Sequence, residues 1–315
     1  MSSQIPALII GGGNIGQAIK KVVKNNAHVA VWDKDHKKSD AKLKLEDTIA
    51  AAELIFICTP SWANREVARG LAQQLGVGYP ESGAQNTKKD HPKLQAPNAK
   101  LVISVSKGME PSGKLTSDIL KEELGGKCDY GILAGPMIAA ELKQGQPTAA
   151  LAALSNPKKQ ILLDKLFKNT NLNLSFSHDL RGLALCSVLK NIYAIALGVA
   201  AGSGAKTNAR SVLTNLALEE MLAIVPLLGG HRETVLGVGG LGDLVTTGWS
   251  EKSYNFTAGC EIGQGKKVED SEGTVAARGI AKLLGKKIDR FTILNTTCRI
   301  VRKELRPSYL LKVVA

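Results

Sequence analysis

A lysine and an aspartate in the second half of the chain are residue types suited to proton transfer. Lys190 and Asn191 interrupt an otherwise apolar segment with helical spacing. Burial disfavours a charged ammonium and lowers its pKa, so such a lysine can act as a general acid or base near neutral pH. Asp243 ends a glycine-rich turn and is followed by Thr247, a carboxylate and a hydroxyl that could hold a polyol and balance the lysine. The alternative is a lysine whose ammonium reaches solvent, and the spacing alone leaves both readings open.

Three glycines near the N-terminus have the spacing of a loop that binds a pyrophosphate. The sequence G-x-G-x-x-G at Gly11, Gly13 and Gly16 follows the apolar run Ala7–Ile10 and opens a helical pattern. Such glycines permit a tight turn and a close approach of backbone to phosphate, and the helix N-terminus attracts negative charge. A plain turn between strand and helix is the alternative. The predicted dinucleotide contacts at this loop are Gly11, Gly13, Asn14, Ile15 and Gly16.

Three further residues follow apolar runs, where ligands bind in a parallel sheet. Asp33 lies roughly 20 residues past the glycines, the position of an acid that binds a ribose hydroxyl. Lys107 and Gly135 each come just after a later apolar run. For Gly135 and the proline after it, a simple turn is the alternative.

The first half of the chain alternates short apolar runs with helical patterns, which is typical of parallel strands buried on both faces. The expected strands are Ala7–Ile10, Val29–Trp32, Leu54–Cys58, Leu101–Ser104 and Gly131–Ala134, with Ala149–Ala153 as a sixth. The expected helices between them are Gln17–Lys24, Ala63–Gln74 and Gly113–Glu123. A long connection rich in glycine, proline and lysine, residues 76–100, is expected to be an exposed loop.

The second half is predicted to be helical. Arg181–Ala201 has apolar residues every three to four positions, the pattern of a buried helix. Further helices are expected at Ser211–Leu227, Gly273–Leu284 and Leu294–Glu304. The fold class is therefore α/β, with an N-terminal Rossmann doubly wound parallel sheet in residues 1–179 and an all-helical C-terminal domain in residues 180–315.

The basic composition favours anionic partners such as phosphates, nucleic acid or acidic lipid, with a solvated basic surface preferred over a nucleic-acid site. Lys and Arg number 41 against 28 Asp and Glu, but the basic residues are dispersed, and 4% aromatic residues are too few for a base-stacking surface. The five cysteines are far apart with no C-x-x-C, and the histidines lack ligand spacing, so we expect a reducing compartment and no metal site. No signal segment is recognised, and no uninterrupted apolar stretch is long enough to span a bilayer. We expect a cytoplasmic protein without nucleic-acid or membrane partners.

Taken together and in order, these motifs resemble those of the NAD(P)-dependent glycerol-3-phosphate dehydrogenases. The resemblance runs from Ile9 to about Gly279. It is carried by GGGNIG, Thr59-Pro60-Ser61, SKGME, GPMIAAEL with Pro147-Thr148, LKN, NARS, GGLGDL and SEGTVAA. It implies a Rossmann domain followed by a helical domain, a homodimer, and interconversion of dihydroxyacetone phosphate and sn-glycerol 3-phosphate. That activity links glycolysis to glycerophospholipid precursors.

The resemblance also implies roles for individual residues. Lys190 would donate or accept the proton at the reacting oxygen, and Lys107 would lie beside nicotinamide and substrate. The implied catalytic residues are Lys190, Lys107 and Asp243. The implied substrate contacts are Lys107, Gly135, Asn191, Asp243, Thr247, Ser253 and Asn255. The implied cofactor contacts beyond the glycine loop are Asp33, Pro60, Lys107, Ala139, Tyr254 and Glu272.

Two residues depart from the family pattern on the substrate side. Tyr254 stands where the family usually has an arginine that meets the substrate phosphate close to the cofactor. A charge-assisted bond contributes about 1.5–3 kcal/mol, so its loss weakens binding by about tenfold to over a hundredfold. Lys252 and Arg210 are the candidates for replacing that charge. Met137 stands where the family often has a small hydroxyl residue.

The choice of cofactor is open at this stage. Asp33 repels a 2′-phosphate and favours NAD. Lys34 stands where the family often carries an arginine associated with NADP, and Lys37 and Lys38 add positive charge. We favour NAD and retain NADP as the alternative.

Three functions are therefore carried forward. The first is an NAD(P)-dependent glycerol-3-phosphate dehydrogenase. The second, motivated by Tyr254 and Met137, is a paralogous dehydrogenase for another small hydroxy or keto substrate. The third is a nucleotide-binding sensor without turnover, for which Lys190 would be dispensable.

Overall fold

The computed structural model describes residues 4–40, 44–75 and 100–313. Within these ranges, seven strands form one sheet in the order β2-β1-β3-β4-β5-β6-β7. The strands are β1 (Ile5–Ile10), β2 (Ala27–Trp32), β3 (Leu54–Ile57), β4 (Leu101–Ser104), β5 (Asp129–Ala134), β6 (Thr148–Leu154) and β7 (Leu172–Ser177). All six expected strands are confirmed. Of the expected loop at 76–100, residues 76–99 lie outside the described residues.

The sheet departs from the expected all-parallel arrangement at one pairing. Strands β1 to β5 are parallel, but β6 pairs antiparallel with β5, and β7 then pairs parallel with β6. The connection from β5 to β6 contains only the short helix α5 (Ala139–Lys143). A parallel strand would need a connection that crosses back to the other end of the sheet, usually through a longer helix, and the five residues of α5 extend only about 7.5 Å. The chain instead re-enters the sheet at the edge where β5 ends.

Strand β7 is absent from the sequence prediction because its pattern is weak. Its residues alternate between apolar and polar, and it forms the edge of the sheet with mostly partly exposed side chains. The other strands are continuous apolar runs, which are easier to recognise.

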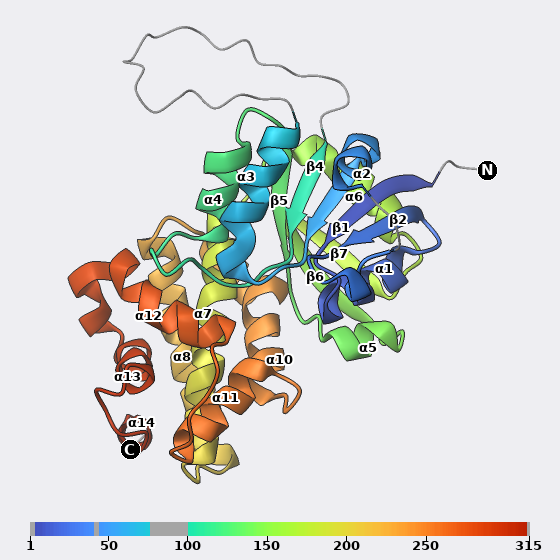
Figure 1. Ribbon diagram of the computed structural model, residues 1–315. Coiled ribbons are helices and arrows are strands. Elements are labelled where there is room, and N and C mark those ends of the chain that lie inside the picture. Colours follow the sequence, from blue (N-terminus) through green and yellow to red (C-terminus); the bar gives the residue numbers. More distant parts are fainter. Residues whose placement is uncertain (1–3, 41–43, 76–99, 314–315) are drawn as a thin grey trace, which may run out of the picture.

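Helices cover both faces of the sheet (Figure 1). Helices α1 (Asn14–Val23), α5 and α6 (Gln160–Phe167) pack on one face. Helices α2 (Leu45–Ala51), α3 (Asn64–Gln74) and α4 (Thr116–Leu124) pack on the other. Side chains alternate accordingly, so Leu8 and Ile10 belong to one hydrophobic cluster while Ala7 and Ile9 belong to the second.

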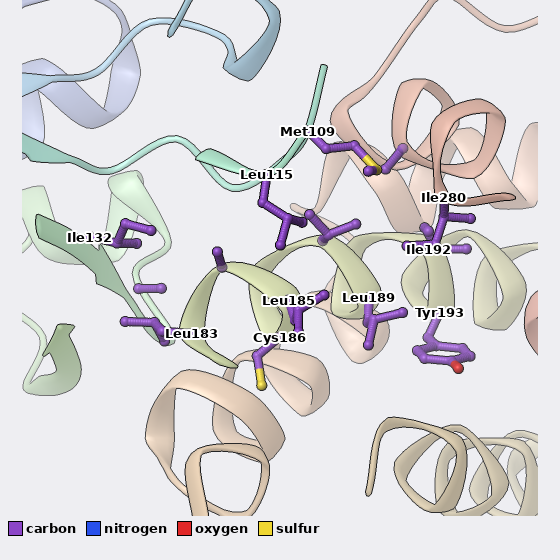
Figure 2. Packing of buried hydrophobic residues seen from close by; sticks show 14 of the residues in the cluster. Met109, Leu115, Ile132, Leu183, Leu185, Cys186, Leu189, Ile192, Tyr193 and Ile280 are labelled. Atoms are coloured by element: carbon purple, nitrogen blue, oxygen red, sulfur yellow. The ribbon is translucent and has the colours of Figure 1, made fainter. Parts of the chain in front are cut away.

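Helix α7 (Leu180–Gly202) is the centre of the helical region. Every residue from Gly182 to Ala200 is buried. Figure 2 shows Leu183, Leu185 and Leu189 of this helix among side chains from β5, from the segment after β4 and from α12. By length and apolar composition alone the helix could cross a membrane, although Lys190 interrupts its apolar run, and its apolar stretch is wholly buried within the protein. It is a core helix.

Helices α7 and α11 (Tyr254–Gly263) cross at very short distance through facing glycines. A Cβ atom at Gly198 would lie 2.1 Å from the Phe256 carbonyl oxygen, and one at Gly259 would lie 2.3 Å from that of Ile195. Only glycine permits backbones to approach this closely. The contact brings the N-terminus of α11 beside the polar middle of α7, where Lys190 and Asn191 lie.

The remaining helices complete the C-terminal half. They are α8 (Thr207–Leu227), α9 (Arg232–Leu236), α10 (Asp243–Trp249), α12 (Glu272–Leu284), α13 (Thr292–Val301) and α14 (Tyr309–Lys312). The predicted helices exist with boundaries shifted by a few residues. Helix α4, for instance, begins three residues later than expected because Gly113 adopts a φ of 93° in a preceding turn.

Candidate active site

A cavity of about 1080 Å³ lies between the sheet and the helical region. Residues that follow β1, β3, β4 and β5 line one side of it, and residues of α7, α10, α11 and the N-terminus of α12 line the other. Ligands of open α/β sheets bind at this location, outside the carboxyl ends of the parallel strands.

Two lysines and one aspartate form a charged cluster at this cavity, in which Lys190 and Asp243 are buried and Lys107 is partly buried. Lys190 Nζ lies 3.3 Å from Asp243 Oδ1, and Lys107 Nζ lies 2.8 Å from Asp243 Oδ2. Lys190 also donates to Thr247 Oγ1 at 2.8 Å, and that hydroxyl in turn donates to Asp243 at 3.2 Å. Lys190 is 4% exposed, so the alternative in which its ammonium reaches solvent is wrong.

The cluster has the electrostatics of a proton-transfer group. Burial lowers the pKa of Lys190 to about 8, against the opposing charge of Asp243 and with some help from Lys107. Burial alone would raise the pKa of Asp243, but the charges of Lys107 and Lys190 outweigh it and lower that pKa. The aspartate therefore stays ionised while the lysine can change its charge near neutral pH.

Two asparagines connect this cluster to neighbouring elements. Asn191 Nδ2 donates to the Lys107 carbonyl, and its Oδ1 accepts from Asn255 Nδ2 at 2.8 Å. Asn255 Oδ1 accepts from the Gly273 backbone N–H at 2.8 Å. The chain of bonds joins the end of β4 to α7, α11 and α12, and both asparagines border the cavity.

The glycine loop forms the other end of the cavity. Gly13, Asn14 and Ile15 line it, and Gly13 is the N-cap of α1, so no side chain caps the first-turn N–H groups. A Cβ atom added at Gly13 would meet nothing within 4 Å, whereas one at Gly16 would lie 2.0 Å from the Gly11 carbonyl oxygen. Open backbone at Gly13 and tight packing at Gly16 fit the requirements of a pyrophosphate.

Asp33 is fixed at the end of β2 beside this loop. Its carboxylate accepts the Gly12 backbone N–H at 2.7 Å and the Asp35 N–H at 2.8 Å. Lys34 forms an ion pair with Glu66 of α3, with Nζ and Oε1 2.8 Å apart. The arrangement holds a negative charge where a ribose would meet the loop.

Glu272 closes the cavity at the N-terminus of α12. Its carboxylate accepts the Ser61 backbone N–H at 2.8 Å and the Ser61 hydroxyl. Burial raises the pKa of Glu272, although these bonds and the charge of Lys190 oppose the effect. Sequence reasoning placed Ser61 in a motif without giving it a role, since a bond across 211 residues has no local signal.

Known proteins match this chain over most of its length. The model of the NAD-dependent glycerol-3-phosphate dehydrogenase N-terminus matches residues 36–160, and that of the C-terminus matches residues 179–312. A glycerol-3-phosphate dehydrogenase (NAD(P)+) from Staphylococcus carnosus is 31% identical over 299 residues, 86% of this chain and 84% of that protein. The chain belongs to the NAD(P)-dependent glycerol-3-phosphate dehydrogenase family.

Other relatives agree with this membership. A glycerol-3-phosphate dehydrogenase (NAD(P)+) from Pseudomonas aeruginosa is 30% identical over 321 residues, 93% of this chain and 88% of that protein. The crystal structure of glycerol-3-phosphate dehydrogenase from Coxiella burnetii has a TM-score of 0.84 at 23% identity and covers 98% of both chains. At that identity the structural likeness shows the fold.

Most of the residues that the family resemblance singles out border the one cavity. The exceptions are Gly11, Gly16, Asp33 and Gly135. Gly135 contacts a residue that lines the cavity, since its carbonyl accepts a hydrogen bond from Lys107 Nζ at 2.6 Å. Lining residues that the sequence analysis did not single out include Trp62, Lys143 and Lys267, which lie outside the family motifs considered.

The two residues that depart from the family pattern lie at the same cavity. Tyr254 is 79% exposed at the start of α11, and Met137 is buried three residues after the end of β5. Of the two candidate replacement charges, Lys252 lines the cavity. The Arg210 guanidinium instead lies over the rings of Trp249, at 4.3 Å, and Phe256, at 5.1 Å.

Proposed function

We propose that this protein interconverts dihydroxyacetone phosphate and sn-glycerol 3-phosphate with a nicotinamide cofactor. The observation that carries the proposal is the buried Lys190, paired with Asp243, in the same cavity as an open glycine loop. A bound nicotinamide supplies or takes up the hydride.

Lys190 moves the proton in this proposal. In the reducing direction its ammonium donates to the oxygen that becomes the hydroxyl, and in the oxidising direction its neutral amine accepts that proton. Asp243 keeps Lys190 oriented, and Lys107 adds positive charge beside the developing alkoxide. Thr247, Asn191, Gly135, Ser253 and Asn255 bind or position the substrate.

The cofactor is assigned to the opposite part of the cavity. Its pyrophosphate is proposed to lie on Gly11, Gly13, Asn14, Ile15 and Gly16, with its remaining contacts from Pro60, Lys107, Ala139, Tyr254 and Glu272. Asp33 is proposed to bind the ribose, which favours NAD because a carboxylate repels a 2′-phosphate. The ion pair of Lys34 with Glu66 supports the same preference.

A dehydrogenase for a different small substrate is the second candidate. It is favoured by Tyr254, which offers no charge to a phosphate, and by Met137, which cannot donate a hydrogen bond. A non-phosphorylated hydroxy or keto compound would then be the better substrate.

The proposal also covers the domain boundary, the oligomeric state, the location and the metabolic role of the protein. We place the domain boundary between residues 179 and 180, where β7 has ended and α7 begins. A homodimer, a cytoplasmic location and a role in supplying phospholipid precursors accompany the proposed activity.

A turnover assay tests the proposal directly. Purified protein is given dihydroxyacetone phosphate with NADH or NADPH between pH 6 and 10, and loss of reduced cofactor is followed. We expect turnover, faster with NADH. Folded protein that binds NADH without turning over dihydroxyacetone phosphate would overturn the proposed reaction and leave the second candidate or a sensor.

A further inference from the structure

The cavity holds five lysines, and they differ in how firmly they are paired. Lys107 and Lys190 are both occupied by the buried Asp243. Lys143 and Lys267 make no ion pair with any residue that the structure describes, and Lys252 has an exposed partner. Because a tyrosine side chain supplies no positive charge, a phosphate group in this cavity must find its counter-charge among the lysines that Asp243 leaves available.

Lys252 is the available lysine connected most directly to the reacting end. It lies in a turn fixed by two bonds, from Lys252 N–H to Ser250 Oγ at 3.2 Å and from Ser253 N–H to the Ser250 carbonyl at 3.0 Å. Three residues further on, Asn255 bonds Asn191, the neighbour of Lys190. A ligand that contacts Lys190 can therefore extend toward Lys252 along the side of the cavity that α11 and the turn before it form.

The partner of Lys252 is held only weakly. Lys252 Nζ lies 3.1 Å from Glu141 Oε1 of α5, and the two side chains are 57% and 43% exposed. Exposed pairs of this kind contribute about 0–1 kcal/mol. A phosphate carries close to two negative charges and several strong acceptor oxygens, so it can displace a single carboxylate from the ammonium.

We propose that Lys252 is the specificity residue that binds the phosphate of the triose substrate, and that Glu141 competes with this phosphate for the Lys252 ammonium. The inference rests on the proposed function and assigns a residue to its phosphate end. Arg210 does not take this part, because its guanidinium lies over the rings of Trp249 and Phe256 and the residue does not line the cavity.

The test compares dihydroxyacetone phosphate with dihydroxyacetone, which lacks the phosphate. The K252M variant is expected to lower the ratio of their kcat/KM values by about tenfold, chiefly through KM, since one charge-assisted bond is lost. E141Q is expected to raise the ratio by about twofold to fivefold, because it removes a competitor worth up to about 1 kcal/mol. In the K252M background E141Q should have no effect.

Lys267 provides the matched control, since K267M removes the same charge from the same cavity. An unchanged ratio in K252M, or an equal fall in K267M, would overturn the assignment. Binding of glycerol 3-phosphate, measured by calorimetry in the presence of NADH, gives an answer independent of turnover. If the wild-type protein does not turn over dihydroxyacetone phosphate, the proposed function is wrong. The difference in glycerol 3-phosphate binding between wild type and K252M decides the role of Lys252 in that case as well.

Discussion

The two ends of the proposed substrate site are built in opposite ways. At the reacting end, Lys190 and Asp243 are buried and Lys107 is partly buried, and all three are held by contacts from the sheet, α7 and α10. At the phosphate end, Tyr254 and Lys252 are exposed and Glu141 is partly exposed, and one weak ion pair joins the two charged groups. Burial strengthens electrostatic interactions and makes their loss costly, whereas exposed charges are screened and easily exchanged. The chemistry is therefore fixed by the core, and substrate specificity depends on side chains that can change at little cost to the fold.

The largest expected effect is at the reacting end. K190M removes the ammonium but keeps much of the side-chain volume, and we expect kcat to fall by about 10²–10⁴-fold because the proton donor is lost. Turnover and NADH binding would be measured together. Unchanged cofactor binding would show that the fold is retained, while activity close to wild type would place the proton transfer elsewhere.

The pH profile should report the same lysine. Because the pKa of Lys190 is about 8, reduction of dihydroxyacetone phosphate should fall as the pH rises through about 8, and oxidation of glycerol 3-phosphate should increase over that range. D243N removes the charge that raises this pKa, so both inflections should move to lower pH. Breaking the buried pair should also lower the free energy of unfolding by about 3–5 kcal/mol, measured by denaturant titration. If the inflections of the D243N pH profile stay at the wild-type pH, the group that titrates is not Lys190.

A smaller effect is expected at the phosphate end. Y254R introduces a guanidinium at the mouth of the cavity, and we expect the KM for dihydroxyacetone phosphate to fall by about tenfold with little change in kcat. Dihydroxyacetone serves as the control substrate. If the KM for the phosphorylated substrate did not respond, the argument that this end binds a phosphate would fail.

The smallest effect is expected at the exposed pair beside Asp33. E66Q releases Lys34, and we expect the KM for NADPH to fall by about twofold while that for NADH is unchanged. Steady-state kinetics with both cofactors measures the ratio. An effect on NADH as large as that on NADPH would mean that Lys34 does not act on the 2′ position.

The fold could be predicted wherever burial imposes a continuous pattern. Five central strands and the long helix α7 were recognisable because both faces of a central strand and all sides of a core helix are apolar, and the edge strand β2 was recognisable from its apolar run Val29–Trp32. Strand β7, at the opposite edge, was not, since polar residues interrupt its apolar residues at every second position. The antiparallel pairing of β5 with β6 was not predicted either, since the direction of β6 depends on the path of the connection.

The sequence by itself determined which chemistry is available. It supplied the glycine loop, a lysine within an apolar segment, an aspartate after a glycine turn and the substitution of tyrosine at residue 254. Only the tertiary structure decided that Lys190 is buried against Asp243, that Ser61 holds Glu272, and that Lys252 borders the cavity while Arg210 does not. The reason is that burial and pairing arise between segments far apart in the chain, when α7, α10 and α11 pack together at the edge of the sheet.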